Sequence, residues 1–421
     1  MAYVTKRVTK RAGLAAAGVS AALLIAACSS SSSSSTGAAT NPTSAPATSA
    51  SSSASASASA PALSVSDITP DFTALGQLTS LASAGKGGVA VILPDTTSST
   101  RWQEFDAPYI KAAFKAAGLA DSDLTVQNAL GSDQTQKSMA ESAITKGASV
   151  LVITPLDSGT GAAIEQAAKA AGVAVIDYDR LTLGGTRGYY VSFDNVKVGT
   201  VMGQGFTQCV KDWSVKSPNV IVMKGAPTDN NATLFAQGYL GVLNPMFSAG
   251  TYKDVSNPPG SWDPPTSLSE FQQQYTAHKN INSALIPNDA NAAAIIHYLQ
   301  NQGIKPKTFP TTGQDASLAG LQNILAGYQC GTVYKPIYFE AGATAALAMY
   351  LRAGRTPPSS LVNGSVVDTV TMVPVPSILA NPEWVTTANM NTTVIKDNFL
   401  PAKQLCAGQY AAECTAAGIS G

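Results

Sequence analysis

The sequence predicts an α/β protein made of two open, doubly wound parallel sheets, each covered by helices on both faces. From Gly87 onward, short β-branched runs alternate with Ala-rich stretches of helical length. The runs GVAVIL at Gly88–Leu93 and SVLVIT at Ser149–Thr154 are apolar throughout, which is typical of strands buried on both faces. Glycines such as Gly118 and Gly172 follow the helical stretches and suit helix C-terminal caps. The alternation occurs in two halves of similar size, which indicates two such sheets.

The first half contains five predicted strands joined by helices. The strands are Gly88–Leu93, Leu124–Asn128, Ser149–Thr154, Val173–Asp177 and Tyr189–Phe193, and the helices are Trp102–Gly118, Gln134–Gly147 and Gly159–Gly172. The second half has predicted strands at Asn219–Lys224, Ser283–Ile286, Thr308–Thr312 and Thr332–Tyr334. Its predicted helices are Val196–Trp213, Ala232–Pro245, Ala290–Gly303, Leu318–Gly327 and Glu340–Gly354.

The N-terminus has the features of an export signal. Basic residues at Lys6 to Arg11 precede a largely apolar run, Ala12–Ala27, which is too short to span a bilayer. The run ends in Leu-Ile-Ala-Ala before Cys28, a sequence that resembles the bacterial lipobox. We therefore expect a signal peptide over residues 1–27 and a lipid on Cys28, with ordinary secretion and a chance cysteine as the alternative.

The next segment is dominated by Ser, Ala, Thr and Pro. It has too little apolar surface to form a core, so we expect residues 28–85 to be the lipidated Cys and a flexible tether. Lys plus Arg equals Asp plus Glu at 26 each. Such a balance gives no reason to expect a nucleic-acid partner, which requires a basic face.

Four cysteines remain after Cys28: Cys209, Cys330, Cys406 and Cys414. Outside the cell an even number permits two disulfides, with three possible connectivities. We predict the pairs Cys209–Cys330 and Cys406–Cys414, and buried free thiols are the alternative. No CxxC is present and the chain has only 2 His residues, so no metal site is predicted.

Polar and charged side chains follow nearly every predicted strand. In open parallel sheets, ligands bind beside the carboxyl ends of the strands. Planar donors and acceptors such as Arg, Asp and Asn suit paired sugar hydroxyls, and charge-assisted hydrogen bonds are about twice as strong as neutral ones. The candidates are Arg101, Trp102, Asp179, Arg180, Asp229, Asn231, Trp262, Asn288, Asp315 and Lys335.

These positions also have structural interpretations. Asp157, Asp194 and Asp289 follow strands and could only cap the next helix, and Asp315 could cap the helix near Leu318. Arg180 could be a surface residue, and Trp102 could be part of the core. Enzyme motifs are missing: the sequence has no nucleophile elbow, no GxGxxG after a strand and no phosphate loop. We therefore expect no enzyme activity and no cofactor.

Six ordered motifs resemble the D-xylose-binding proteins of ABC transporters, within the ribose- and galactose-binding type of periplasmic protein. The six motifs are Arg101-Trp102-Gln103, Tyr178-Asp179-Arg180, Ser192-Phe193-Asp194-Asn195, Asp229-Asn230-Asn231-Ala232, Gly313-Gln314-Asp315-Ala316 and Val333-Tyr334-Lys335-Pro336. The resemblance implies sugar hydrogen bonds from Arg101, Asp179, Arg180, Asn231, Asn288, Asp315 and Lys335. It implies a stacking role for Trp262, while Pro287 before Asn288 and the tail after Asn398 depart from the family pattern.

The resemblance implies a type I periplasmic binding protein with two lobes joined by three hinge segments. We expect lobe one at residues 86–194 plus 336–370 and lobe two at 195–335 plus 371–421. The implied function is extracytoplasmic binding of a monosaccharide, with D-xylose preferred, and its delivery to an ABC permease. We expect the protein to be a monomer that is lipid-anchored to the outer face of a bacterial membrane.

Several alternatives remain open. Glucose, galactose or arabinose could be the ligand, and the same fold could serve a sugar sensor or chemoreceptor. A transcriptional regulator would require a basic helix-turn-helix ahead of Gly87, where the Ser/Ala segment stands instead. A sugar isomerase would require carboxylate and His metal ligands.

Overall fold

The computed structural model describes residues 62–419. The predicted signal peptide at 1–27, Cys28 and most of the predicted tether therefore lie outside the described residues. Within 62–419 no helix is both long enough and apolar enough to cross a membrane.

Lobe one is built on a seven-stranded sheet in the order β11-β12-β5-β4-β3-β1-β2. The strands are β1 Gly88–Leu93, β2 Leu124–Asn128, β3 Ala148–Ile153, β4 Ala174–Tyr178, β5 Tyr189–Phe193, β11 Gly364–Asp368 and β12 Val373–Ala380. All neighbouring pairs are parallel except β11 with β12. Val91 in β1 lies opposite Val126 and Val152, so the continuous apolar runs form the buried centre of the sheet.

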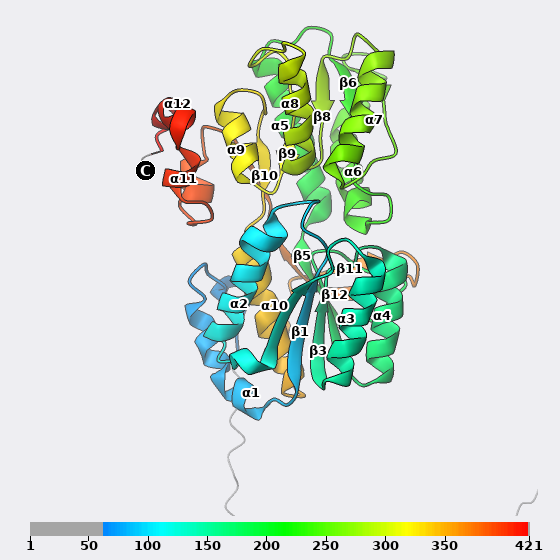
Figure 1. The fold of residues 1–421 in the computed structure, drawn as a ribbon, viewed down its shortest axis with the longest axis vertical. Helices are drawn as coiled ribbons and strands as arrows, with labels where there is room; N and C mark the ends of the chain where they lie inside the picture. Colours follow the sequence, from blue (N-terminus) through cyan, green and yellow to red (C-terminus); the bar gives the residue numbers. More distant parts are fainter. Residues whose placement is uncertain (1–61, 420–421) are drawn as a thin grey trace, which may run out of the picture. The chain divides into compact units, whose positions relative to one another are not determined.

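Helices cover both faces of this sheet (Figure 1). They are α2 Ala107–Ala116 and α10 Ile337–Arg352 on one face, and α3 Asp133–Thr145 and α4 Ser158–Ala170 on the other. The predicted helix from Trp102 begins as a π-helical turn over Trp102–Asp106, which leads directly into α2. This turn presents Arg101 and Trp102 at the carboxyl end of β1.

The predicted tether boundary at residue 85 is wrong for the described part of that segment. Residues 62–85 contain the 3-10 helices η1 Val65–Asp67 and η2 Thr73–Leu78 and the helix α1 Thr79–Ala84. Ile68, Phe72 and Leu75 are buried in the same core as α2 and α10. Their spacing of three to four residues is helical, and the Ser-rich composition upstream obscured it.

Lobe two has two three-stranded sheets, β7-β6-β8 and β13-β10-β9. The strands are β6 Asn219–Val222, β7 Lys253–Ser256, β8 Ser283–Leu285, β9 Gly313–Gln314, β10 Thr332–Tyr334 and β13 Glu383–Val385. A parallel bridge between Ala284 and Thr311 links the two sheets. The strand expected at Thr308–Thr312 is reduced to this bridge, and β9 begins just after it.

The helices of lobe two pack around these strands (Figure 1). They are α5 Asn195–Asp212, α6 Asn230–Ser248, α7 Pro264–Ala277, α8 Asp289–Asn301 and α9 Leu318–Leu325. Glycine permits the close contact of α5 with α6, because a Cβ on Gly199 or Gly238 would collide with the backbone of the other helix.

The chain passes between the lobes three times: after β5, after β10 and after β12. This arrangement confirms the predicted fold class of two doubly wound lobes with a three-segment hinge. The expected position of the third crossing is wrong, because β12 pairs with β5 in lobe one. Residues 371–380 therefore belong to lobe one, and β13 pairs with β10 in lobe two.

The C-terminal segment packs beside α9, as the red helices in Figure 1 show. It contains the π-helical turn Asn391–Ile395, α11 Ala402–Leu405, the 3-10 turn Gly408–Tyr410 and α12 Ala411–Ala416. The sulfur atoms lie 2.04 Å apart in the pair Cys209–Cys330 and 2.06 Å apart in the pair Cys406–Cys414. Both predicted pairs are therefore at bonding distance, and non-reducing peptide mapping would test whether the disulfides form.

Candidate functional site

A cavity of about 30 Å³ lies between the two lobes, at the carboxyl ends of their strands. Its lining residues come from both lobes: Ser98, Ser99, Arg101, Trp102, Asp179, Arg180, Asp229, Asn231, Phe235, Trp262, Asn288, Gln314, Asp315 and Lys335. All ten candidates from the sequence are in this set.

Sequence reasoning missed Ser98, Ser99, Phe235 and Gln314. Ser98 and Ser99 belong to the loop after β1, and Gln314 ends β9, so the position at a strand end was the available signal. Phe235 lies one helical turn after Asn231 on α6, which places both on one face of that helix.

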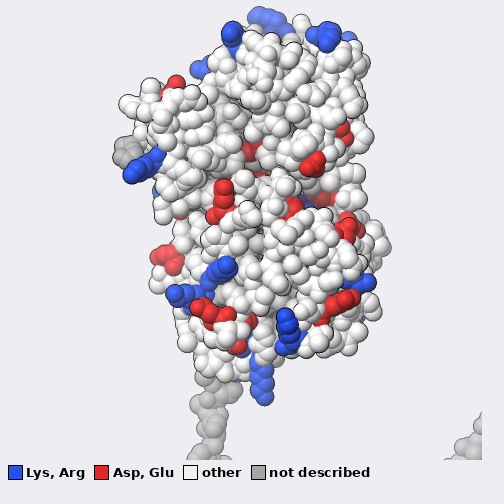
Figure 2. Space-filling view, in the orientation of Figure 1, with Lys and Arg blue, Asp and Glu red and all other residues white. Residues whose placement is uncertain are grey.

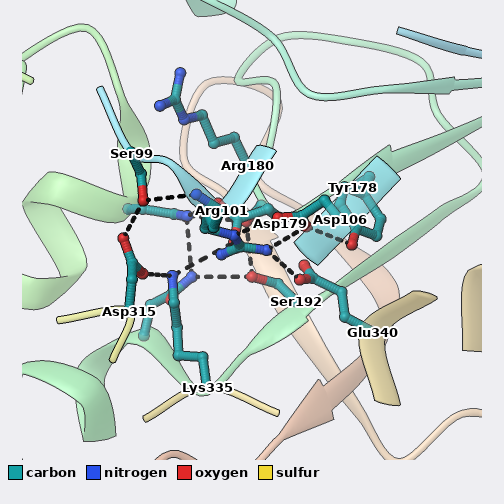
Figure 3. Close-up of polar contacts among 12 residues, drawn as sticks. Ser99, Arg101, Asp106, Tyr178, Asp179, Arg180, Ser192, Asp315, Lys335 and Glu340 are labelled. Atoms are coloured by element: carbon teal, nitrogen blue, oxygen red, sulfur yellow. Dashed lines mark hydrogen bonds and ion pairs between the residues drawn. The ribbon is translucent and has the colours of Figure 1, made fainter. Parts of the chain in front are cut away.

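The Arg101 guanidinium is the centre of a buried charge cluster in lobe one (Figure 3). It is 1% exposed. Its Nη1 donates to Asp179 Oδ2 at 2.6 Å, its Nη2 to Asp106 Oδ1 at 2.6 Å and to Glu340 Oε2 at 2.7 Å, and its Nε to Asp106 Oδ2 at 2.8 Å. Burial raises the pKa of Glu340 well above its ordinary value and raises that of Asp106, although Arg101 opposes both shifts. The cluster fixes Asp179 against one edge of the cavity.

Asp179 is held ionised by its surroundings. Burial alone would raise the pKa of Asp179, but the nearby cations Arg101, Lys335 and Arg180 outweigh burial and lower it to about 2. Its backbone has a φ of 61°, which is uncommon for a residue other than Gly. The Asp179 carbonyl accepts hydrogen bonds from Tyr190 Oη and Ser192 Oγ, both at 2.7 Å, and these bonds hold the turn.

Asp315 faces the same cavity from lobe two. Its Oδ2 accepts a hydrogen bond from Ser99 Oγ of lobe one at 2.7 Å, and its Oδ1 lies 3.1 Å from Lys335 Nζ. Ser317 caps α9, accepting from Gly320 N, so the interpretation of Asp315 as that cap is wrong. Figure 3 shows the Asp315 and Lys335 side chains directed toward Asp179.

The cap interpretation fits other strand-end residues. Asp157 caps α4 and Asp194 caps α5, and neither lines the cavity. Asp289 does not cap α8. Asn288 does so through its Oδ1, while its Nδ2 donates to the Ser98 carbonyl of lobe one at 2.8 Å. Pro287 therefore does not turn Asn288 away from the site.

Two further contacts cross the cleft. Arg180 Nε lies 3.2 Å from Asp229 Oδ2, and both side chains are almost fully buried, so Arg180 is not a surface residue. Asn231 Nδ2 donates to the Asp179 carbonyl at 2.9 Å. Burial raises the pKa of Asp229, although Arg180 opposes this shift. The lobes are thus in direct polar contact around the cavity.

The two tryptophans supply apolar surface. Trp102 lines the cavity and also packs in the lobe-one core, with the Arg101 and Arg180 guanidinium carbons 4.5 and 5.6 Å from its ring centre. Trp262 Nε1 donates to Asp229 Oδ2 at 2.9 Å. This bond anchors the loop before α7.

The charges of the lining residues balance: three cations (Arg101, Arg180 and Lys335) face three carboxylates (Asp179, Asp229 and Asp315). Such a lining suits an uncharged ligand with many hydroxyl groups. No group of three or more His, Cys, Asp or Glu within residues 62–419 could hold a metal ion. On the face in Figure 2, charged side chains of both signs are scattered over a mostly uncharged surface.

Comparisons with known proteins identify the family. Residues 89–356 match the family described as periplasmic binding protein domain. The chain is 35% identical over 331 residues to the D-xylose-binding periplasmic protein of Escherichia coli, a match that covers 78% of this chain and 96% of that relative. It is 31% identical over 344 residues to the multiple sugar-binding periplasmic receptor ChvE of Rhizobium radiobacter, covering 77% and 93%. The chain therefore belongs to the periplasmic binding protein family.

Solved structures agree with this assignment. A carbohydrate transporter solute-binding protein from Chloroflexus aurantiacus, in complex with D-glucose, aligns with a TM-score of 0.66 and 28% identity, covering 75% of this chain and 97% of that one. An ABC transporter solute-binding protein from Clostridium phytofermentans with bound β-D-glucose aligns with a TM-score of 0.67 and 26% identity. This alignment covers 75% of this chain and 99% of that one. These proteins bind solutes and are not enzymes, which agrees with the expectation from the sequence.

Proposed function

We propose that this protein is the extracytoplasmic sugar-binding component of an ABC transporter and that D-xylose is its preferred ligand. The observation that carries the proposal is the balanced set of three cations and three carboxylates that meets in one small interlobe cavity. Ionised groups paired in this way can bond hydroxyl groups in several directions, while a charged ligand would upset the balance.

Ligand binding is coupled to lobe closure in this proposal. Lobe one supplies Arg101, Trp102, Asp179 and Arg180, and lobe two supplies Asp229, Asn231, Trp262, Asn288, Asp315 and Lys335. A sugar can bond both sets only when the lobes approach one another, so it stabilises the closed state. The closed surface is then the form that a permease recognises.

The N-terminal features complete the proposal. Export by the signal at 1–27 and lipidation of Cys28 would hold the protein at the outer face of the membrane. The Ser/Ala-rich residues after Cys28 would connect the lipid to the folded lobes. We propose that the protein works there as a monomer.

The preference for D-xylose rests on the similarity to the D-xylose-binding relative. The second candidate is a hexose such as glucose or galactose, or the pentose arabinose. Similarity to a multiple sugar-binding receptor and to two glucose-bound structures favours this candidate.

Calorimetric titration of the secreted chain carrying Cys28→Ser, with D-xylose, L-arabinose, D-glucose, D-galactose and D-ribose, tests the proposal. We expect one site per chain and the tightest binding for D-xylose. Asp179→Asn should weaken binding, while Asp263→Asn, which alters the cap of α7 outside the cavity, should not. If a hexose binds more tightly than D-xylose, that hexose becomes the preferred ligand. If no sugar gives a heat of binding, the proposed sugar-binding function is refuted.

A sugar sensor with the same fold is the alternative to transport. Co-precipitation from membranes cross-linked in the presence of the bound sugar separates the two. Recovery of a permease supports transport, and recovery of a membrane kinase or chemoreceptor alone contradicts it.

A further inference from the structure

Asp289 is a buried carboxylate that lies next to the cavity without lining it. It is the first residue of α8 and is 1% exposed. Its oxygens accept three hydrogen bonds, from Ser317 N at 2.8 Å, Gln329 Nε2 at 2.8 Å and Thr332 Oγ1 at 2.9 Å. Among the ion pairs of the described residues, none includes Asp289. These three donors offset part of the cost of burying a carboxylate without a cation.

The surrounding backbone makes room for this carboxylate. A Cβ built on Gly313 or on Gly320 would collide with the Asp289 carboxylate oxygens. Gly313 is in β9 and Gly320 is in α9, so the two elements on either side of Asp315 close around Asp289.

The turn between these two elements is strained. Asp315 has a φ of 94° and Ala316 a φ of 50°, in the left-handed region that residues other than Gly adopt only at a cost. Such a turn persists only when its surroundings hold it. The N–H of Ala316 donates to Thr332 Oγ1 at 3.2 Å, and this hydroxyl in turn donates to Asp289. Asp289 therefore holds Ser317 directly and Ala316 through Thr332.

We propose that Asp289 is a positioning residue for sugar binding: it fixes the turn Asp315–Ser317 so that the Asp315 carboxylate points into the cavity. The inference rests on the proposed function, in which Asp315 bonds the sugar. Burial and the charge of Asp315 raise the pKa of Asp289 to about 7, although the hydrogen bonds from Gln329, Ser317 and Thr332 oppose this shift.

A double-mutant cycle in sugar affinity tests the inference. The proteins are the secreted chain with Cys28→Ser and the same chain with Asp289→Asn, with Asp315→Asn, and with both. D-Xylose is the probe, or D-glucose if it binds the parent more tightly. We expect about 10-fold weaker binding for Asp289→Asn, equivalent to one or two lost hydrogen bonds, and about 30-fold for Asp315→Asn. The double variant should match Asp315→Asn within about 2-fold, because Asp289 acts through Asp315.

Thr332→Val is a second route to the same contact, since it removes only the hydroxyl between Asp289 and Ala316. It should weaken binding as well, again without adding to Asp315→Asn, and it serves if Asp289→Asn does not fold. Ligand-free melting curves ensure that every titration is made on folded protein.

The outcomes separate two failures. If Asp315→Asn binds like the parent, the proposed role of Asp315 fails and the inference fails with it. If Asp315→Asn is weak but both Asp289→Asn and Thr332→Val bind like the parent, only the inference is overturned. Losses that multiply in the double variant would also overturn it, because they would show a general structural effect.

Discussion

Asp315 offers a test that separates ligand binding from fold stability. The perturbations are Asp315→Gly, Asp315→Ala and Ser317→Ala. In the structure the Asp315 carboxylate contacts Ser99 across the cleft and Lys335 within its own lobe, whereas Ser317 caps α9 and does not line the cavity. The two side chains are two residues apart, so they share a backbone environment but have different partners.

The structure sets the expected magnitudes. Loss of a charged partner from desolvated hydrogen bonds costs on the order of 2–5 kcal/mol, which is about 30-fold or more in affinity. At a φ of 94°, Gly is unstrained, whereas Asp and Ala both carry a strain of about 1–2 kcal/mol. Asp315→Ala therefore leaves the backbone strain unchanged, and Asp315→Gly removes it. Removal of the Ser317 cap costs about 1 kcal/mol of stability and takes no group from the cavity.

The assays are calorimetric titration with D-xylose and melting of the ligand-free proteins. Asp315→Ala should lose affinity and keep its melting temperature, and Asp315→Gly should lose affinity and melt no lower than the parent. Ser317→Ala should melt lower and keep most of its affinity. If Asp315→Gly binds the sugar like the parent, or if Ser317→Ala loses as much affinity as Asp315→Gly, the assignment of Asp315 to the site is refuted.

Three further predictions concern other parts of the chain. Cys28→Ala should abolish labelling by a tagged fatty acid, and persistent labelling would contradict the lipobox assignment. The pKa of Asp289 is about 7 in the folded protein and near 4 in the unfolded chain. Its contribution to folding stability is therefore fully present below about pH 4 and is lost as the pH rises through about 7. From pH 5 to pH 8 this loss is on the order of 2–3 kcal/mol, so the ligand-free melting temperature should fall less over that range in Asp289→Asn than in the parent. An equal fall of the melting temperature in both proteins would contradict the raised pKa. Phe399 of the C-terminal segment stacks on Phe105 of lobe one with ring centres 4.0 Å apart, and such a pair contributes about 0.5–1.5 kcal/mol beyond burial. Phe399→Ala should therefore disfavour lobe closure and weaken sugar affinity about 3- to 10-fold. Unchanged affinity in a folded variant would contradict this prediction.

The site could be predicted from the sequence because its residues follow strands. A buried parallel strand is visible as an apolar run, and its carboxyl end is the edge of the sheet where ligands bind. The ten candidates therefore meet in one cavity although they come from separate positions between residues 101 and 335. The same rule did not distinguish ligand-facing carboxylates from caps such as Asp157, because both stand at the same point of a βα unit.

Other features give weak signals in the sequence. In β12, Pro374 and Pro376 interrupt the apolar pattern. Proline normally argues against a strand, because its backbone nitrogen carries no hydrogen to donate, unless that nitrogen faces away from the ladder. The two-residue strand β9 is too short for any periodicity. The C-terminal segment has only short helices, and it packs on α9 through scattered apolar residues. These elements depend on tertiary contacts rather than on local pattern, so the third hinge crossing was misplaced.

Arg101 shows how the structure refines a role carried over from relatives. The resemblance implies a sugar hydrogen bond from this residue, and a guanidinium has five N–H donors. Four of them are already used, two by Asp106, one by Asp179 and one by Glu340. At most one N–H, on Nη1, is left for a ligand, so the main contribution of Arg101 is to hold Asp179 ionised and in place. The number and geometry of these bonds require the planar fork of an arginine, and we expect the sugar hydrogen bonds at this edge of the cavity to come chiefly from the carboxylate that Arg101 positions.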